Sequence, residues 1–126
     1  MLNAREEEIA KMIVNAAFVV HKALGPGLLE SVYELCFCYE LEKLGLLVQR
    51  QLPVSINYDG LTFDAALRLD DFVEGSIICE LKAVEFVLPV HTAQLLSYKR
   101  LKAVRLGFII NFNVPVIKDG IKRMIL

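Results

Sequence analysis

The apolar residues at the start of the chain recur at intervals of three and four, the spacing that gathers side chains on one face of an α-helix. This pattern predicts a first helix over residues 5–24, with acidic residues in its first turn, where the helix dipole favours them. A Gly-Pro-Gly sequence ends this helix. A second helix is predicted from about Leu29 to Leu44, ended by Gly45.

From Leu46 the apolar residues alternate with polar ones, which is the period of a β-strand. A first strand is predicted up to Tyr58, and its proline argues for an edge, a bulge or a break. Asp59-Gly60 is a strong hairpin signal, so residues 61–73 are predicted to return as a second strand. A turn at residues 74–76 leads into a third strand, and the three strands form an antiparallel meander.

The last third of the chain returns to a helical pattern and then to strands. Pro89 is predicted to open a third helix, to about Ala103, because the first turn of a helix tolerates proline. Residues 105–112 form an apolar run suited to the interior of a sheet. A turn at residues 118–120 precedes a last strand, predicted over residues 121–126.

Length and composition indicate one folded domain. The chain has 126 residues, of which 56% are hydrophobic and 23% charged, so residues 1–126 are predicted to form a single domain with one core. The formal net charge is −1, which gives no overall attraction to nucleic acid. A phosphate-binding surface would have to be local. The one local basic cluster is at the end of the third helix, from Lys99 to Arg105, where it is predicted to be a solvated face.

Targeting and redox signals favour the cytoplasm. The chain has no uninterrupted apolar run long enough to span a membrane, and its acidic start does not resemble a signal peptide. The three cysteines lie in apolar runs and are predicted to be free thiols in a reducing compartment. Cys36 and Cys38 are two residues apart on a predicted helix, so they do not share a face.

The strongest candidate for chemistry is the third strand of the meander. Because side chains alternate along a strand, Glu80 and Lys82 share one face and Cys79 the other. If residues 74–76 form a three-residue loop with a left-handed glycine, Asp70 lies opposite Glu80. A two-residue loop would instead place Asp70 opposite Cys79.

Two carboxylates beside a lysine suit metal-assisted chemistry. Carboxylate oxygens are ligands that Mg²⁺ and Mn²⁺ prefer, and they leave coordination positions open for water and phosphate. A neighbouring lysine can orient that water or stabilise a developing anion. The alternative is an ion pair between Glu80 and Lys82 that lines no site.

Three residues of the first two helices have structural alternatives to a functional role. Glu30 lies in the first turn of the second helix, where it is predicted to be a surface carboxylate that favours the dipole. Tyr33 is three residues further on, within reach of Glu30 on the same face. His21 is one turn before the end of the first helix, where it is expected to interact favourably with the helix dipole.

The order of predicted elements, with Asp and E-x-K on the meander, resembles the PD-(D/E)xK nuclease superfamily, whose α/β core is restriction-endonuclease-like, a mixed β-sheet with an antiparallel meander flanked by helices. More specifically, the chain is similar to the GxxExxY family of small bacterial and archaeal proteins. The motifs that carry this similarity cover nearly the whole chain: Gly27-x-x-Glu30-x-x-Tyr33, Arg68-Leu-Asp70, Glu80-Leu-Lys82-Ala83, His91-x-x-Gln94-Leu-Leu-Ser-Tyr98, Gly107-Phe-Ile-Ile-Asn111-Phe112 and Gly120-Ile-Lys122-Arg123.

The resemblance implies roles for five side chains and one backbone group. Asp70 and Glu80 would hold a divalent metal, Mg²⁺ or Mn²⁺, helped by the backbone carbonyl of Cys79, and Lys82 would position or activate the attacking water. Glu30 would be an additional acidic site residue, and Gln94 would line the same pocket. The implied reaction is metal-assisted hydrolysis of phosphodiester bonds, with DNA as the expected substrate.

One residue departs from the family pattern. Asp71 stands where an apolar residue is usual, which leaves room for a register error of one residue at Asp70. Asp64 is a further acidic residue, which strand parity predicts on the face of Asp70.

Two other functions fit the sequence. One is a non-catalytic nucleic-acid or protein-binding module that keeps the nuclease fold, since fold alone does not establish function. The other is a metal-dependent hydrolase that acts on a small phosphorylated ligand in a closed pocket. As a nuclease, so small a chain would need a homodimer or a protein partner to grip a duplex.

Overall fold

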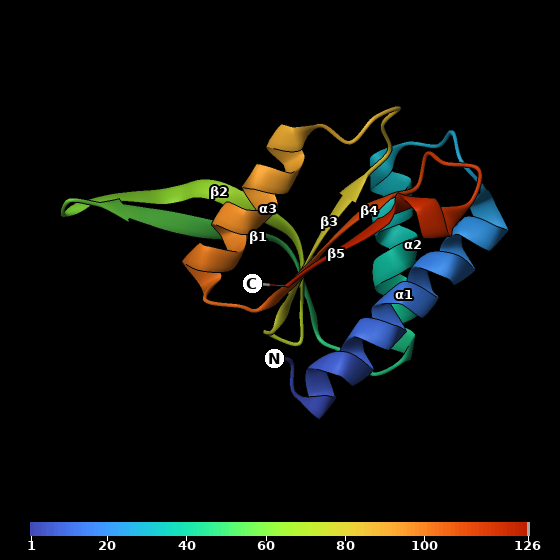
Figure 1. Cartoon of the computed structure of the whole chain (residues 1–126), viewed down its shortest axis with the longest axis horizontal. Helices are drawn as coiled ribbons and strands as arrows, with labels where there is room; N and C mark the ends of the chain where they lie inside the picture. Colours follow the sequence, from blue (N-terminus) through green and yellow to red (C-terminus); the bar gives the residue numbers. More distant parts are fainter. Residues whose placement is uncertain (126) are drawn as a thin grey trace.

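The structure is a computed structural model that describes residues 1–125, except for the side chains of residues 65 and 66. The described chain contains three α-helices, one short 3₁₀ helix and five strands (Figure 1). Their order is α1 (Ala4–Leu24), α2 (Glu30–Lys43), β1 (Val48–Tyr58), β2 (Leu61–Val73), β3 (Ile77–Lys82), α3 (Pro89–Lys102), β4 (Leu106–Asn111), η1 (Ile117–Gly120) and β5 (Ile121–Ile125).

The strands form one mixed sheet in the order β1-β2-β3-β4-β5. β1, β2 and β3 are antiparallel neighbours, and β5 is antiparallel to β4. β3 and β4 are parallel, with α3 as the crossover between them. Because parallel neighbours need such a crossover, the helix predicted between two strands is what makes the sheet mixed. The predicted mixed sheet with an antiparallel meander and flanking helices is confirmed.

Helices cover both faces of the sheet, so β3 and β4 lie in the middle of a three-layer arrangement (Figure 1). The first face packs against α1 and α2, which contribute Ile13, Ala17 and Phe37 to the larger core cluster. The second face packs against α3, which contributes Leu95 and Tyr98. Every residue of β4 is buried, as its continuous apolar run predicts.

The turn between β2 and β3 has the predicted three-residue form. Val73 pairs with Ile77, so the loop is residues 74–76, and Glu74 and Gly75 both have positive φ, at 53° and 61°. Asp71 pairs with Cys79 in this register. The register therefore sets Asp70 beside Glu80, and the two-residue alternative is wrong.

The alternation of faces along β2 is interrupted at Asp70 and Asp71. Leu69 and Phe72 both belong to the cluster under α3, whereas Asp71 between them contacts α2 on the other face. On the partner strand Gln51 has a φ of 51°, which is uncommon for a residue with a side chain. We call this change of side, centred on Gln51 and Asp70, the face switch. It is why the apolar position expected at 71 holds an aspartate.

Beyond the face switch, β1 and β2 leave the body of the protein as a two-stranded arm (Figure 1). β3 pairs with β2 only over residues 71–73, so the rest of the hairpin has no further strand beside it. Asp59 and Gly60 make the tight turn at its tip, as predicted, with φ of 48° and 84°. Asp64 lies exposed on this arm, away from the site, so parity alone does not bring it beside Asp70.

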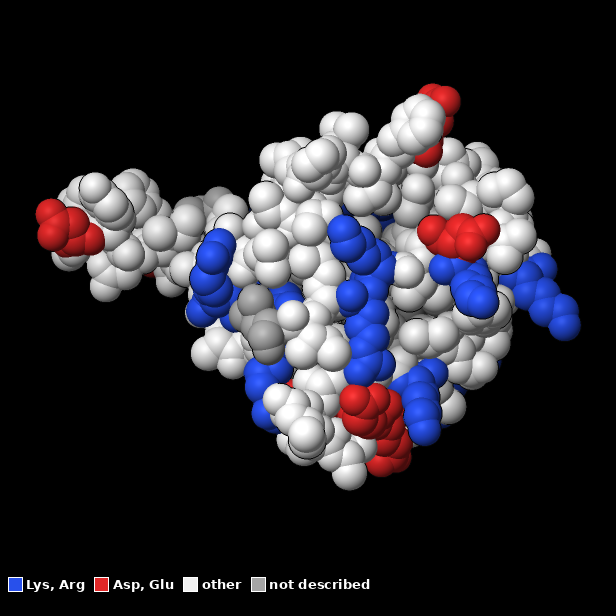
Figure 2. All heavy atoms as spheres, in the orientation of Figure 1, with Lys and Arg blue, Asp and Glu red and all other residues white. Residues whose placement is uncertain are grey.

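The basic cluster at the end of α3 is only partly a solvated face. Lys99 is fully buried, and its Nζ donates a hydrogen bond to the Met124 carbonyl at 2.7 Å. Arg105 forms an ion pair with Glu6 at 2.6 Å. The prediction of a solvated face is wrong for Lys99, because its contact with β5 cannot be read from local spacing, whereas Arg105 is exposed although it pairs with α1. Figure 2 shows basic side chains crossing the face that carries β5, with acidic ones directly below them.

The predicted element boundaries hold to within one or two residues. The end predicted for the last strand, Leu126, lies outside the described residues. His21 bonds through Nε2 to the Val114 carbonyl at 2.8 Å, so it ties α1 to the loop before η1. Within residues 1–125, no helix has the length and apolar character needed to cross a membrane.

Candidate active site

Asp70 and Glu80 meet where β2 and β3 begin to part. The Asp70 N–H donates to Glu80 Oε2 at 3.3 Å, and the Leu81 N–H donates to Asp70 Oδ2 at 2.9 Å. The second bond uses a side chain because the backbone pairing of β2 with β3 ends at Asp71 and Cys79. The register error considered for Asp70 is therefore absent, and the two carboxylates lie side by side.

Glu80 is a carboxylate with too few partners. Its side chain is buried, and Oε1 has no hydrogen-bond partner among the described residues. The pKa of Glu80 is raised to about 9, chiefly by burial and also by the hydrogen bond and the charge of the Asp70 side chain, while the Asp70 backbone N–H and the charge of Lys82 oppose the shift. A buried oxygen without a partner is costly unless a proton or a cation satisfies it. The pair therefore fits a divalent cation that prefers oxygen ligands.

Lys82 ends β3 beside this pair and is half-buried. Its positive charge lowers the pKa of both Glu80 and Glu30, so it faces the same region as these acids. None of the ion pairs within residues 1–125 involves Lys82. The alternative interpretation, a closed Glu80–Lys82 ion pair, is thus not what the side chains form.

Glu30 comes to the site from α2. It is the first residue of that helix and lines a hollow of about 250 Å³ with Ser31, Glu34, Gln51 and Asp70. Burial raises the pKa of Glu30, and the charges of Asp70 and Glu34 raise it further against the effect of Lys82. Glu30 is exposed, as a surface carboxylate would be, yet it shares this hollow with Asp70.

Tyr33 holds the loop that leads to Glu30, and its hydroxyl makes its hydrogen bonds to that loop and not to Glu30, which spacing alone had placed within reach. Its hydroxyl donates to the Gly25 carbonyl at 2.6 Å and accepts from the Leu28 N–H at 3.0 Å. Its ring stacks on Phe112, with centroids 4.7 Å apart. Tyr33 is completely buried, so it clamps the loop between α1 and α2 and thereby holds the start of α2.

Gln94 is not brought into contact with the carboxylate pair. It is exposed on α3 and lines a groove of about 520 Å³ between that helix and the arm. Tyr98, one turn later on α3, does feel the charge of the pair. Burial raises the pKa of its hydroxyl, and the negative charges of Glu80 and Asp70 raise that pKa further. The role implied for Gln94 stays a prediction.

A polar layer that the sequence did not reveal lies beneath the site. Cys38 Sγ donates to Asp71 Oδ1 at 3.0 Å, and both residues are buried. Glu34, one turn earlier on α2, accepts hydrogen bonds from Arg50 and Gln51, each at 2.9 Å. The available signal was the spacing of four between residues 34 and 38, which places them on one helix face.

Burial dominates the electrostatics of this layer. The pKa of Asp71 is raised to about 8, chiefly by burial and with a smaller contribution from the charges of Glu34 and Asp70, whereas the Cys38 hydrogen bond and the charge of Arg50 oppose the shift. Burial also raises the pKa of Cys38, so this thiol stays protonated and serves as a donor. Asp71 Oδ2 has no partner among the described residues.

The backbone of β3 offers two carbonyls near the carboxylate pair. Cys79 has its side chain completely buried on the opposite face, and its backbone lies between Asp71 of β2 and Phe108 of β4. Leu81 lies past the end of the β2 pairing, and its N–H already turns toward Asp70. Within residues 1–125, no cluster of three or more His, Cys, Asp or Glu side chains could hold a metal ion, so backbone oxygens or water would complete a coordination shell around Asp70 and Glu80.

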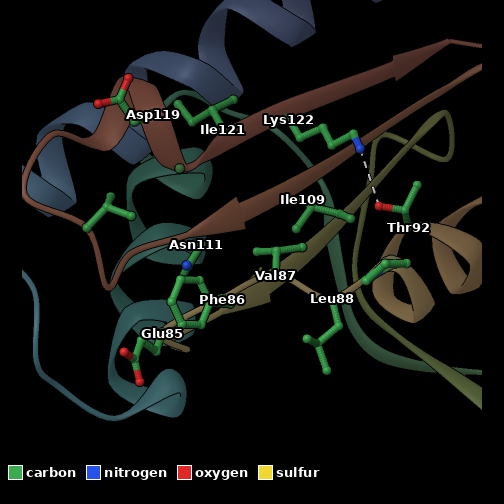
Figure 3. Close-up of a pocket in the computed structure, with 13 residues that line it drawn as sticks. Glu85, Phe86, Val87, Leu88, Thr92, Ile109, Asn111, Asp119, Ile121 and Lys122 are labelled. Carbon is green, nitrogen blue, oxygen red and sulfur yellow. Dashed lines mark hydrogen bonds between the residues drawn. The ribbon is translucent and has the colours of Figure 1, made fainter.

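A larger cavity, of about 630 Å³, lies beside β4 and β5 (Figure 3). Its acidic residues, Glu85 and Asp119, point outward from it, and Lys122 donates to Thr92 Oγ1 at 3.4 Å at the other end. The Asn111 amide is already used, because it binds both the N–H and the carbonyl of Val84. None of the predicted site residues lines this cavity.

A family model described as PD-(D/E)XK nuclease superfamily matches residues 7–124. The match covers nearly the whole chain, and the chain belongs to this superfamily. No curated protein and no solved structure gives a significant match to this chain. The fold agrees with this membership, since the superfamily is one of nucleases and the chain has a mixed sheet with Asp70 and Glu80 on its meander.

Proposed function

We propose that the protein is a metal-dependent nuclease that hydrolyses phosphodiester bonds in DNA, and that it is a GxxExxY-type member of the superfamily. The observation that carries this proposal is the contact between Asp70 and Glu80, with one buried Glu80 oxygen left without a partner. Nothing in the packing of the described residues requires two acids at this position, and burying them together costs free energy. A site that binds a cation explains why they are there.

Asp70 and Glu80 would hold Mg²⁺ or Mn²⁺, which supplies a water of lowered pKa and stabilises charge on a phosphoryl oxygen. The Leu81 N–H fixes one oxygen of Asp70 and leaves the other free. Glu80 would have to be ionised to hold a cation, so binding would be coupled to proton release. The backbone donor implied by the resemblance is the Cys79 carbonyl. Because β2 pairs with β3 only as far as Cys79, we expect the Leu81 carbonyl to be the metal ligand instead.

Lys82 would orient the attacking water or stabilise the pentavalent anion. This role is supported by its charge, which acts on Glu80 and Glu30, and by its absence from the ion pairs within residues 1–125. Glu30 would be a third acid at the mouth of the site and would position water from the side of α2. Gln94 lies in the groove beside α3 and away from the carboxylate pair, so the role that the resemblance implies for it carries no weight in this proposal.

The test is a calorimetric titration of Mg²⁺ and Mn²⁺ into the wild-type protein, an Asp70→Asn/Glu80→Gln variant and a control variant, Asp119→Asn. Asp119 is exposed and lies at a different cavity, so its variant should bind like the wild type. We expect Mn²⁺ binding that the double variant loses. Cleavage of labelled DNA and RNA by the same proteins, with Lys82→Ala added, identifies the substrate.

We expect Lys82→Ala to remain folded and to lose metal-dependent cleavage while it still binds Mn²⁺. Unfolding of both Lys82→Ala and Glu80→Gln would show that these residues stabilise the fold and would contradict the proposal. Metal binding without cleavage of either nucleic acid would favour the alternative, a non-catalytic binding module on the nuclease fold.

A further inference from the structure

The arm formed by β1 and β2 carries an apolar face that nothing in the chain covers. Ile56 pairs with Phe63, and Tyr58 pairs with Leu61. Paired residues on neighbouring strands, and residues two apart on one strand, lie on the same face. These four side chains therefore form one continuous surface, which we call the apolar stripe. Asn57 and Thr62, also a pair, lie on the opposite, polar face.

The apolar stripe is a continuation of the core. It begins at the groove between the arm and α3, where Ile56 and Leu67 face Val90 and Leu101. Toward the tip the cover ends: Tyr58 is 69% exposed, Leu61 60% and Phe63 50%. A two-stranded ribbon is marginally stable alone, and contiguous exposed apolar surface of this kind marks an interaction site.

The charges at the two ends of the apolar stripe are opposite. The tip carries Asp59, and no Lys or Arg occurs between residues 51 and 67. The other end, at the groove, carries Arg100, which forms none of the ion pairs within residues 1–125. Figure 2 shows the projecting arm without basic side chains on the visible face and with acidic ones at its end. The outer part of the arm therefore offers no positive charge to phosphate, so it does not suit nucleic acid.

We propose that the apolar stripe binds the same stripe of a second copy of this chain, with the two arms antiparallel. A two-fold axis reverses the direction of the stripe, so the acidic tip of each copy meets the basic groove end of the other. Asp59 of each copy then lies against Arg100 of the other, and Tyr58 and Phe63 enter the apolar groove beside α3. The same surface of each copy forms one half of the interface, and the opposite charges at the two ends of that surface fix the antiparallel orientation.

The proposal is tested by sedimentation velocity of the wild-type protein at concentrations from about 1 to about 100 µM. We expect a species of twice 14.2 kDa that dissociates on dilution. Tyr58→Ser/Phe63→Ser should weaken the dimer at least about a hundredfold, because buried aromatic residues dominate interfaces. The matched control, Asn57→Ser/Thr62→Ser, changes the two adjacent positions, which lie on the polar face of the ribbon, and should leave the dimer unchanged.

A double-mutant cycle tests the orientation. Asp59→Asn keeps a residue that tolerates the left-handed turn, and Arg100→Gln removes the opposite charge. Each change should weaken the dimer about threefold, and the two together no more than one alone, because they remove the same contact. A monomeric wild type overturns the proposal, and so does a dimer that the stripe variant leaves intact. Concentration-dependent amide shifts confined to the arm and α3 would support it, and shifts elsewhere would contradict it. Loss of metal binding or cleavage has no bearing on this outcome, so the two proposals fail separately.

Discussion

Replacing Asp71 with asparagine should change how the stability of the metal-free protein depends on pH. Asp71 is fully buried, and its pKa rises from 3.8 to about 8 because burial disfavours the charged form. In the unfolded chain the same carboxyl ionises near its ordinary value of about 4. Between these two values the unfolded chain releases a proton that the folded chain keeps, so stability is full below the unfolded pKa and falls as the pH rises toward 8.

The magnitude follows from the shift. One group that titrates in this way removes about 1.4 kcal/mol of stability for each pH unit. Asparagine has nearly the same shape and cannot ionise, so its Oδ1 can still accept the Cys38 hydrogen bond. Its buried amide costs about 1–3 kcal/mol at every pH because the position of Oδ2 offers no partner. The free energy of unfolding of Asp71→Asn relative to wild type should therefore rise by about 3 kcal/mol from pH 5 to pH 7.

Urea unfolding in a chelator, followed by circular dichroism at half-unit steps of pH, measures this difference. Asp64→Asn, at an exposed position on the arm, is the control and should show no such trend. A constant difference between wild type and Asp71→Asn across the range would refute the reasoning, because it would mean that Asp71 titrates alike in the folded and unfolded protein.

Two further changes test parts of the fold that hold the site. Tyr33→Phe should lower the free energy of unfolding by about 1–3 kcal/mol, because the Gly25 carbonyl and the Leu28 N–H lose their shared partner while the stacking on Phe112 remains; a chemical denaturation curve that matches wild type would show that the clamp contributes nothing. Gly107→Ala should cost about 1–3 kcal/mol by overpacking, because the added Cβ would lie 2.8 Å from Leu95 Cδ1; unchanged stability would mean that α3 is free to move away from β4.

The local pattern of apolar and polar residues was sufficient to predict most of the helices and strands. The change of period from 3.6 to two located the helices and the meander, and the Glu74-Gly75-Ser76 turn predicted the register that sets Asp70 beside Glu80. These features depend on neighbours in sequence, which a pattern records. The mixed sheet was implied by the resemblance to the PD-(D/E)xK superfamily, and the one helix between two strands explains it.

The features that the pattern missed depend on contacts between distant segments. Lys99 is buried because the Met124 carbonyl receives its ammonium group, and nothing near Lys99 in the sequence indicates this. Asp71 is buried because it contacts Cys38 of α2, and this contact interrupts the regular alternation of side chains between the two faces of β2. Tyr33 turned to the loop before α2 and not to Glu30, since the hydroxyl finds a carbonyl and an amide there.

The face switch at Gln51 and Asp70 divides the hairpin into two parts that answer to different constraints. On the body side, every residue is fixed by the register that keeps Asp70 beside Glu80 and by the contacts of Asp71 with α2. On the arm side, residues can be gained or lost in cross-strand pairs without moving either carboxylate, because the arm has no third strand beside it. The length and the side chains of the arm are thus free to diverge among related chains while the carboxylate pair stays the same, so the association proposed for the arm and the chemistry proposed for the carboxylate pair can evolve independently.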